Sequence, residues 1–201
     1  MKFNPEYLEF DEESHTYWYQ GEVIPSVTTI IKAADAGADY SGIPDYILKR
    51  AAEIGTDVHK RIELHYLEGS DPVSDDEKAN EYLVGFEQFL ADDVFECWET
   101  ERKLACPKYW FSGTVDLVGW VNGELAVIDV KTTSKLHHET VEYQLSAYQY
   151  LAELFYEEPI PKRYALHLKK KGSRRYALEP MMSNPGARHQ FLKWAVDYNA
   201  N

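Results

Sequence analysis

Cysteine, long hydrophobic runs and excess positive charge are all scarce in this sequence. Cys97 and Cys106 are the only cysteines among 201 residues, too few for a disulfide framework or for an iron–sulfur cluster held by four thiolates, so we expect no iron–sulfur cofactor. The longest apolar runs have the length of a strand, which argues against a membrane span, and the first residues lack the apolar stretch of a secretory signal. We therefore expect a protein of the reducing cytoplasm, without membrane association.

The formal net charge of −13 argues against a protein that coats nucleic acid by bulk attraction. A chain that is 44% hydrophobic and 14% aromatic can bury a core, so we expect neither disorder nor a rod. Basic residues are nevertheless concentrated between positions 162 and 175, where seven lysines and arginines occur without an acidic residue. A solvated hairpin tip is the simplest interpretation of this segment, but the segregation of charge also allows a functional one.

The chain contains no repeat and no low-complexity linker, so we expect a single domain over residues 1–201, with an N-terminal hairpin and helix extension at about 1–43. Hydrophobic periodicity, caps and turn residues predict helices over residues 26–32, 44–68, 74–90, 139–157 and 185–198. They predict strands over residues 15–19, 22–24, 94–105, 110–121, 124–131, 164–168 and 175–178. We also expect Ser74 to open its helix through a capping box. This order of elements predicts an α+β (mixed α/β) fold with a central sheet flanked by helices.

Asn122-Gly123, between two strand-like runs, is the strongest short hairpin signal in the sequence. In a two-residue hairpin centred there, facing residues have numbers that sum to about 245, which is the sum for Asp116 and Asp129. We therefore expect these aspartates to face each other as a non-hydrogen-bonded pair, the kind whose side chains lie closest. Lys131 lies two residues past Asp129 and emerges on the same face.

Two carboxylates about 5 Å apart repel each other by roughly 3 kcal/mol at an effective dielectric constant of about 20. The residues around Asp116 and Asp129 are apolar, which is typical of central, buried strands. A divalent cation converts such repulsion into binding, because Mg²⁺ takes carboxylates, waters and phosphate oxygens as ligands. Two alternatives remain: a bulge near Gly119 turns one aspartate to solvent, or Lys131 alone neutralises the pair.

Residues 111–118 (FSGTVDLV), followed by residues 127–132 (VIDVKT), resemble the signature of the PD-(D/E)XK nuclease superfamily. The likeness is to its RecB-like branch, which includes phage exonucleases, CRISPR-associated nucleases and mitochondrial genome-maintenance exonucleases. Val115 stands where the motif has a leading proline, and the second acidic residue is Asp129 rather than a glutamate. Residues 55–63 resemble the upstream helix motif of this branch, residues 144–148 its QxxxY motif, and residues 23–28 an N-terminal stretch of phage and prophage members.

The resemblance implies a restriction-endonuclease-like fold with a central mixed β-sheet, and a metal-dependent DNA nuclease. An exonuclease acting in phage or prophage DNA recombination, repair or processing is the activity it favours. The catalytic residues it implies are Asp116, Asp129, Lys131, Gln144 and Tyr148. The ligands it implies for one or two Mg²⁺ or Mn²⁺ ions are His59, Asp116, Asp129, Glu101 and the carbonyl of Val130. Glu99 has the same strand parity as Glu101 and is a rival for its role.

The same resemblance gives the basic segment a role on single- or double-stranded DNA. Its residues Lys169, Lys170, Lys171, Arg174 and Arg175 are expected to contact the DNA backbone without reading its sequence. Tyr109 and Trp110 are candidates for stacking on unpaired bases, with core packing as the favoured alternative. The resemblance leaves open a phage recombination partner protein and a homo-oligomer, and it places the protein in the cytoplasm of a bacterium or a phage-infected host.

Two other functions stay open. One is a non-catalytic DNA-binding or assembly module on a nuclease-like scaffold, although decay should have removed at least one of Asp116, Asp129 and Lys131. The other is an unrelated metal hydrolase that uses His59, His137 and His138, which leaves Lys131 and the hairpin register unexplained. For single residues, a structural histidine is the alternative at position 59, and core packing with a polar handle is the alternative at Gln144 and Tyr148.

Overall fold

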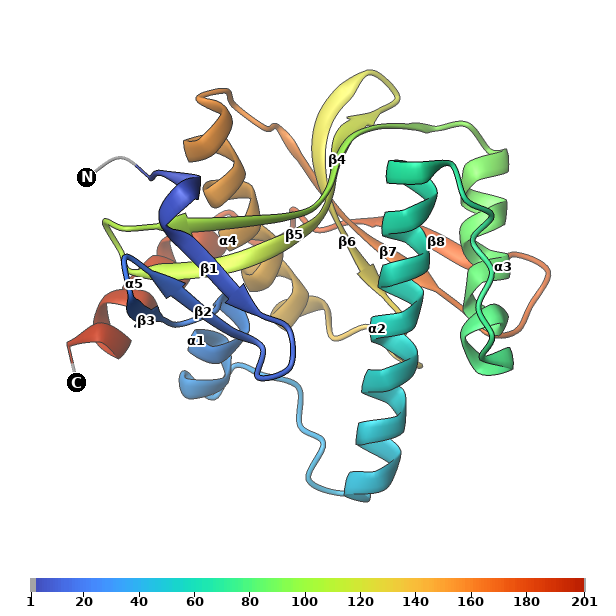
Figure 1. Cartoon of the computed structure of the whole chain (residues 1–201), viewed down its shortest axis with the longest axis horizontal. Coiled ribbons are helices and arrows are strands. Elements are labelled where there is room, and N and C mark those ends of the chain that lie inside the picture. The colour runs from blue at the N-terminus through green and yellow to red at the C-terminus, as the bar shows by residue number, and fades with distance from the viewer. Residues whose placement is uncertain (1–2, 201) are drawn as a thin grey trace.

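The computed structural model describes residues 3–200, so the outermost residues of the expected domain, 1, 2 and 201, lie outside it. The helices are η1 (Pro5–Tyr7, a 3₁₀ turn), α1 (Val27–Ala33), α2 (Asp45–Glu68), α3 (Glu77–Ala91), α4 (His138–Tyr156) and α5 (Ala187–Asn199). The strands are β1 (Leu8–Asp11), β2 (Thr16–Tyr19), β3 (Glu22–Ile24), β4 (Phe95–Cys106), β5 (Phe111–Val121), β6 (Glu124–Lys131), β7 (Lys162–Leu168) and β8 (Tyr176–Pro180). Figure 1 shows their arrangement.

The main sheet has five strands in the order β4-β5-β6-β7-β8. Neighbouring strands are antiparallel except β6 and β7, which run parallel and are joined through α4. A parallel pair requires such a crossover, because a tight turn cannot return the chain to the same end of the sheet. The predicted α+β class, with a central mixed sheet flanked by helices, is confirmed. Within residues 3–200, no helix combines the length and the apolar character that crossing a membrane requires.

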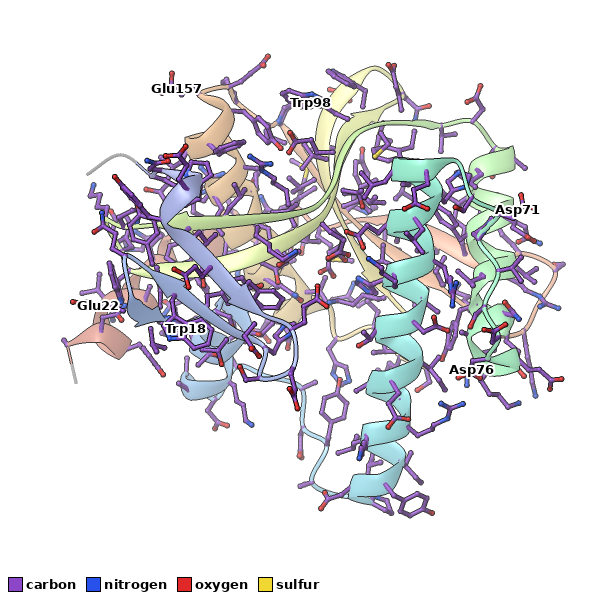
Figure 2. The ribbon with its side chains drawn as sticks, viewed as in Figure 1. Trp18, Glu22, Asp71, Asp76, Trp98 and Glu157 are labelled. Atoms are coloured by element: carbon purple, nitrogen blue, oxygen red, sulfur yellow. The ribbon has the colours of Figure 1, made fainter. Side chains whose placement is uncertain are left out.

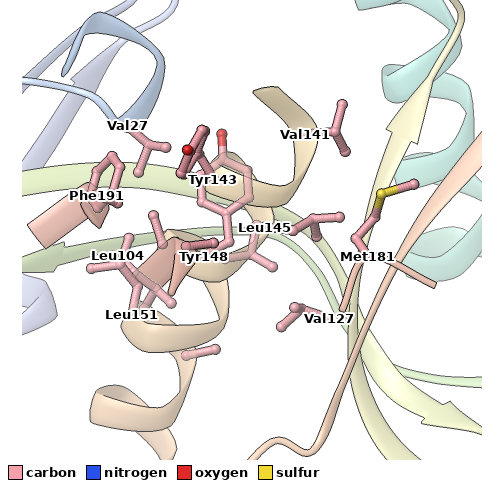
Figure 3. Packing of buried hydrophobic residues seen from close by; sticks show 14 of the residues in the cluster. Val27, Leu104, Val127, Val141, Tyr143, Leu145, Tyr148, Leu151, Met181 and Phe191 are labelled. Carbon is pink, nitrogen blue, oxygen red and sulfur yellow. The ribbon is translucent and has the colours of Figure 1, made fainter. Parts of the chain in front are cut away.

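Helices cover both faces of this sheet. Helices α1, α4 and α5 pack on one face, in a core that includes Val27, Leu145 and Phe191 (Figure 3). Helices α2 and α3 pack on the other face, where Val58 and Phe86 belong to the second large cluster. The central strands β5 and β6 are therefore buried on both sides, which accounts for their nearly continuous apolar sequence.

The β5–β6 hairpin has the predicted turn and register. Asn122 and Gly123 have φ values of 49° and 81°, and two positive values are what a type I′ turn requires. The pairing runs from Val121↔Glu124 to Leu117↔Ile128, so the expected sum of residue numbers is confirmed over this stretch. Apart from Glu124 next to the turn, this stretch consists of apolar residues and Gly119, and the turn lies at the end of the hairpin remote from Asp116 and Asp129.

The next expected pair, Asp116 and Asp129, does not continue this ladder. A regular continuation would direct the Val130 amide to the carbonyl of Val115. The Val130 amide instead donates to Oδ2 of Asp116, at 2.7 Å. The prediction that Asp116 and Asp129 form a regular non-hydrogen-bonded pair is therefore wrong in detail. The carboxylate of Asp116 takes the place of the Val115 carbonyl as the acceptor for the Val130 amide.

An additional strand and a different helix cap also distinguish the structure from the prediction. Strand β1 was not expected, yet it pairs with β2 and completes a three-stranded sheet. Asp76, not Ser74, is the N-cap of α3, and its side chain accepts a hydrogen bond from the Lys78 amide. Ser74 has other partners, because its hydroxyl accepts from the Asp76 amide and donates to Asp57 on α2.

Candidate active site

A pocket of about 410 Å³ opens between the three-stranded N-terminal sheet, α2 and the near ends of β4, β5 and β6. The N-terminal sheet reaches it through Tyr17, whose hydroxyl lies 2.7 Å from that of Thr114 on β5. The wall of the pocket brings together seven of the residues predicted from the sequence: His59, Glu101, Asp116, Asp129, Lys131, Gln144 and Tyr148. These residues come from α2, β4, β5, β6 and α4, so the pocket exists only in the folded chain.

His59 on α2 is at the centre of the group of candidate ligands. Its Nδ1 atom lies 3.3 Å from Oε1 of Glu101 and 3.5 Å from Oδ2 of Asp116. Its Nε2 atom lies 3.2 Å from the carbonyl oxygen of Val130. One ligand atom from each of His59, Glu101 and Asp116 lies within 4.8 Å of the other two. Three of the other four predicted metal ligands therefore contact His59: Glu101 and Asp116 at Nδ1, and the Val130 carbonyl at Nε2.

Asp129 and Lys131 form a second contact group in the same pocket. The Lys131 ammonium lies 2.7 Å from Oδ2 of Asp129 and donates to Oε1 of Gln144 at 2.9 Å. Gln144 in turn donates to the hydroxyl of Tyr148, at 3.0 Å. Asp129 is 2% exposed, and its Oδ2 atom is the one paired with Lys131.

The pocket concentrates negative charge away from water, and its titratable groups are shifted accordingly. Burial raises the pKa of Asp116 to about 7, against the attraction of His59 and with the repulsion of Asp129 and Glu101 adding to the rise. Burial alone would lower the pKa of His59, but Asp116 and Glu101 outweigh it and raise the value to about 9. Burial by itself would also lower the pKa of Lys131. The negative charges of Asp129 and Asp116 outweigh this effect, so the pKa of Lys131 lies above its ordinary value.

The donors present fit a divalent cation. Imidazole nitrogen, carboxylate and main-chain carbonyl oxygen are ligands that Mn²⁺ accepts, and the oxygens suit Mg²⁺ as well. The independent sign of fit is the burial of Asp116 and Asp129 in one pocket with Glu101, because buried carboxylates repel one another and are costly unless cations balance them. The alternative in which one aspartate points to solvent at a bulge near Gly119 is excluded, because Asp116 is 8% exposed and Asp129 is 2% exposed.

Glu99 and Glu101 are separated by the structure, although strand parity predicts that they share a face. Glu101 lines the pocket. Glu99 instead accepts a hydrogen bond from the Tyr156 hydroxyl at 2.5 Å and lies 3.4 Å from Nε of Arg102. The expectation of equal parity is wrong because Glu101 has a φ of 48°, a left-handed conformation that reverses the alternation within β4.

Strand β5 changes faces at the same level. Val115 packs in the cluster with α4, whereas Leu117 packs in the cluster with α2, although residues two apart on a strand normally share a face. Asp116 lies between them, opposite the left-handed Glu101 of β4. A left-handed non-glycine residue costs about 1–3 kcal/mol, and such strain is concentrated at functional sites. In this protein, the strained residue is Glu101, and its side chain lines the same pocket as that of Asp116.

Gly113 explains how α4 comes close enough to contribute. A Cβ atom at this position would lie 2.7 Å from Cε1 of Tyr148, so a larger residue would displace the tyrosine ring. Burial raises the pKa of Tyr148 well above its ordinary value, which keeps the hydroxyl protonated as the partner of Gln144. The glycine in the FSGT run therefore has a packing role that the motif alone did not reveal.

Five residues of the pocket lie outside every motif and every predicted site: Phe10, Glu12, His15, Tyr17 and Lys103. Burial raises the pKa of Tyr17 to about 12, so its hydroxyl remains a neutral partner of Thr114. The alternation of the 15–19 run was enough to predict a strand. No local pattern indicated which part of the chain that strand would pack against.

The five basic residues predicted to bind DNA all lie within residues 3–200, and none of them lines this pocket. They lie in the β7–β8 turn, beside α3 (Figure 1). Arg174 is paired with Asp92 at 2.9 Å, which occupies its charge. Lys170 lies over the Tyr82 ring and lines a neighbouring cavity that shares Gly55, His59 and Lys131 with the pocket. Of the five, Lys170 is therefore the one whose cavity adjoins the pocket.

Other candidates are placed elsewhere. His137 and His138 line a separate cavity with residues 34–39, so the trio required by an unrelated metal hydrolase is not assembled with His59. Tyr109 packs against Tyr150, and Trp110 donates to the carbonyl of Val23. Core packing, the favoured interpretation of these two aromatic residues, is therefore confirmed.

Comparisons with known proteins agree with this arrangement. The family profile described as the PD-(D/E)XK nuclease superfamily matches residues 35–199. No curated protein matches the chain in sequence. The structure of a candidate exonuclease from Eubacterium rectale is similar with a TM-score of 0.52 and 11% identity, over 90% of this chain and 73% of the other. LHK-Exo in complex with dAMP has a TM-score of 0.43 and 8% identity, over 88% and 86% of the two chains. At such identities the first likeness bears on the fold, and the second carries no argument.

Proposed function

The chain belongs to the PD-(D/E)XK nuclease superfamily, and from this premise we propose that it is a Mg²⁺- or Mn²⁺-dependent deoxyribonuclease that acts as an exonuclease. The observation that carries the proposal is one pocket in which His59, Glu101 and Asp116 come together beside the Asp129–Lys131 pair. Bound cations and a fixed positive charge near the phosphate both promote phosphodiester hydrolysis, and this pocket offers ligands for the cations and a lysine as the fixed charge.

The residues that would hold the ion are His59, Glu101, Asp116, Asp129 and the carbonyl of Val130. When bound, a Mg²⁺ or Mn²⁺ ion lowers the pKa of a coordinated water and stabilises negative charge on phosphate oxygens. In the protein itself, the carboxylates of Asp116, Asp129 and Glu101 supply negative charge that attracts the ion, and His59 is held in place from both ring nitrogens.

Lys131 carries a fixed positive charge at the wall of the pocket. Its raised pKa keeps the ammonium protonated, and Asp129 and Gln144 fix the direction in which it points. A preorganised cation of this kind stabilises charge that develops on a phosphate oxygen. Gln144 and Tyr148 touch Lys131 or each other, so we assign them to positioning this lysine.

DNA as the substrate and removal of nucleotides from an end are the finer parts of the proposal. They are supported by the motif resemblance to exonucleases of the RecB-like branch. The relative from Eubacterium rectale is itself described as a candidate exonuclease and shares the fold. The stretch at residues 23–28, which resembles phage and prophage members, supports a place in phage DNA processing.

The test combines end-labelled linear DNA and covalently closed circular DNA with Mg²⁺, Mn²⁺ or EDTA. We expect metal-dependent release of nucleotides from linear strands, an intact circle, and no activity in EDTA. Cutting of the circle would overturn the exonuclease assignment and leave a nuclease. Binding without cleavage under every metal condition would favour the rival, a non-catalytic DNA-binding module on a nuclease scaffold.

A matched pair of variants makes this test specific to the pocket. Lys131→Ala should abolish cleavage, because it removes the fixed charge. Lys135→Ala removes an exposed lysine four residues further along the chain, outside the pocket, and should leave the rate unchanged. Equal cleavage by both variants would show that the activity does not come from this site.

A further inference from the structure

On the side of the N-terminal sheet, the pocket is lined by three aromatic side chains and Glu12, and β4 adds Lys103 beside them. Phe10 and Tyr17 have ring centroids 4.4 Å apart, and the ring of His15 lies 5.1 Å from that of Phe10. We call these three residues the aromatic wall. Lys103 adds a cation, with its Nζ atom 5.3 Å from the centroid of Phe10. None of the four has a role in the mechanism proposed above.

The members of the aromatic wall differ in what the fold needs from them. Tyr17 is 2% exposed, and its hydroxyl is bonded to Thr114, so it belongs to the core of the N-terminal sheet. Phe10 is half-buried, and His15 is exposed in the turn between β1 and β2. Both line the pocket. Tyr17 therefore supports two rings that remain available to something inside the pocket.

Lys103 connects this wall to the candidate metal ligands. It lies two residues after Glu101 on β4, and its partner in the ladder is Thr114, two residues before Asp116. Both Lys103 and Glu101 line the pocket. An ammonium in this position can bind a phosphate oxygen of a nucleic acid strand that passes from the wall to the carboxylates.

We propose that the aromatic wall is a nucleobase subsite of the pocket. The rings of Phe10 and His15 lie at 83° to each other, so one stacks on an unpaired base of the nucleotide next to the cleaved phosphodiester while the other contacts the edge of that base. Lys103 binds an adjoining phosphate. The inference rests on the proposed nuclease function and adds a substrate requirement to it. Because a base within a duplex is already stacked on its neighbours, the nucleotide must be single-stranded or frayed to use this subsite.

The experiment uses single-stranded oligonucleotides that carry one abasic residue at successive positions from the end. Cleavage of each by the wild-type protein gives kcat and KM in the metal that supports activity best. An abasic residue at the position next to the cleaved bond should raise KM about tenfold, the loss expected for one base–aromatic stack. The remaining positions should have smaller effects.

Three variants link this position to the wall. Phe10→Leu keeps apolar bulk but cannot stack, and His15→Ala changes an exposed turn residue, so the fold should survive the second even where it does not survive the first. Both should raise KM on the intact oligonucleotide about fivefold to tenfold and leave kcat within about twofold. Trp18→Ala is the control, because Trp18 belongs to the same small sheet but does not line the pocket (Figure 2).

The decisive readout is the combination of variant and substrate. If Phe10 and His15 bind that base, their substitution should cost nothing further on the oligonucleotide whose sensitive position is abasic. Folded variants with wild-type KM, or variants that lose as much on the abasic substrate, would overturn the subsite while the nuclease function stands. A wild-type protein that cleaves no DNA overturns the nuclease function first, so the two failures are distinct.

Discussion

Near its turn the β5–β6 hairpin is a regular apolar ladder, whereas near the pocket the same two strands carry buried carboxylates and a backbone amide bonded to a side chain. The ladder holds its register from Val121↔Glu124 to Leu117↔Ile128. One residue later, Asp116 accepts from the Val130 amide and the strand changes faces. Stability is thus concentrated at one end of the hairpin and chemistry at the other, a division that mutation can test.

Asp116→Asn should show the largest effect and should affect activity alone. Loss of a preorganised charge that stabilises the reaction costs about 10²–10³-fold in rate, while the asparagine oxygen still accepts from Val130. Burial raises the pKa of Asp116 to about 7, so the stability that its protonated form contributes at low pH is lost as the pH rises through 7, and above that pH the buried carboxylate disfavours folding. The variant should be at least as stable as the wild type at pH 8, as thermal unfolding would show. A markedly less stable variant would show that the pocket end of the hairpin also contributes to stability.

Ile128→Ala should show the opposite pattern. Ile128 is fully buried in the ladder, and a large-to-small change there costs about 2–5 kcal/mol of the free energy of unfolding. Its kcat, measured where the variant is still folded, should stay within a few-fold of the wild type. Denaturant unfolding and cleavage rates measured on the same sample check both parts. A large loss of kcat in the folded variant would mean that the two ends of the hairpin are coupled.

Glu101→Gln and Glu99→Gln test the change of face in β4. Glu101 is in the pocket, and its loss should weaken Mn²⁺ affinity by about 10–100-fold, the range seen for residues that hold or orient metal ligands. Glu99 is bonded to Tyr156 on the other side, and its glutamine variant should bind Mn²⁺ as the wild type does. Calorimetric titration measures both. Equal effects would show that strand parity, rather than the observed conformation, describes the site.

The affinity for Mn²⁺ should also depend on pH. The pKa of His59 is raised to about 9, so at pH 7 the imidazole carries a proton that a metal ion must displace. Affinity should increase by up to about tenfold per pH unit between pH 7 and 9 and then level off. Titration at several pH values, with proton uptake by the buffer, tests this. The slope should become smaller in His59→Gln, and a flat profile in the wild type would argue against His59 as a ligand.

Gly123→Ala should have the smallest effect and should be confined to stability. Gly123 has a φ of 81°, a conformation that costs other residues about 1–2 kcal/mol. The variant should lose this much free energy of unfolding with no change in kcat, because the turn is at the end of the ladder farthest from the carboxylates. A change in kcat of more than twofold in the folded variant would show that the turn end of the hairpin also affects activity.

The same contrast explains what the sequence could predict. Asn122-Gly123 fixes a turn and thereby a register through local backbone chemistry, so the ladder was predictable residue by residue. The motif residues on α2, β5, β6 and α4 could be found because each motif is contiguous, and the pocket gathers them. Helix α2 was predictable because its buried residues Ile54, Val58 and Ile62 repeat every four residues.

The parts that escaped prediction depend on contacts between distant segments. Glu101 adopts a left-handed conformation that no residue preference favours, so parity could not separate it from Glu99. The offset of Asp116 arises because its carboxylate competes with a carbonyl for the Val130 amide. Phe10 and His15 line the pocket because the N-terminal sheet packs on β4 and β5. The sequence of that sheet does not indicate which part of the chain it packs against.

The bond from the Val130 amide to Asp116 also gives the pocket a spectroscopic reporter. An amide proton held by a carboxylate changes its chemical shift when the charge on that carboxylate changes. Occupancy of the site by a cation, or protonation of Asp116, can therefore be followed at a single backbone resonance near the C-terminal end of β6, without substrate. Since β6 pairs with β7 through the neighbouring residues, the same signal would report whether events in the pocket propagate into the sheet.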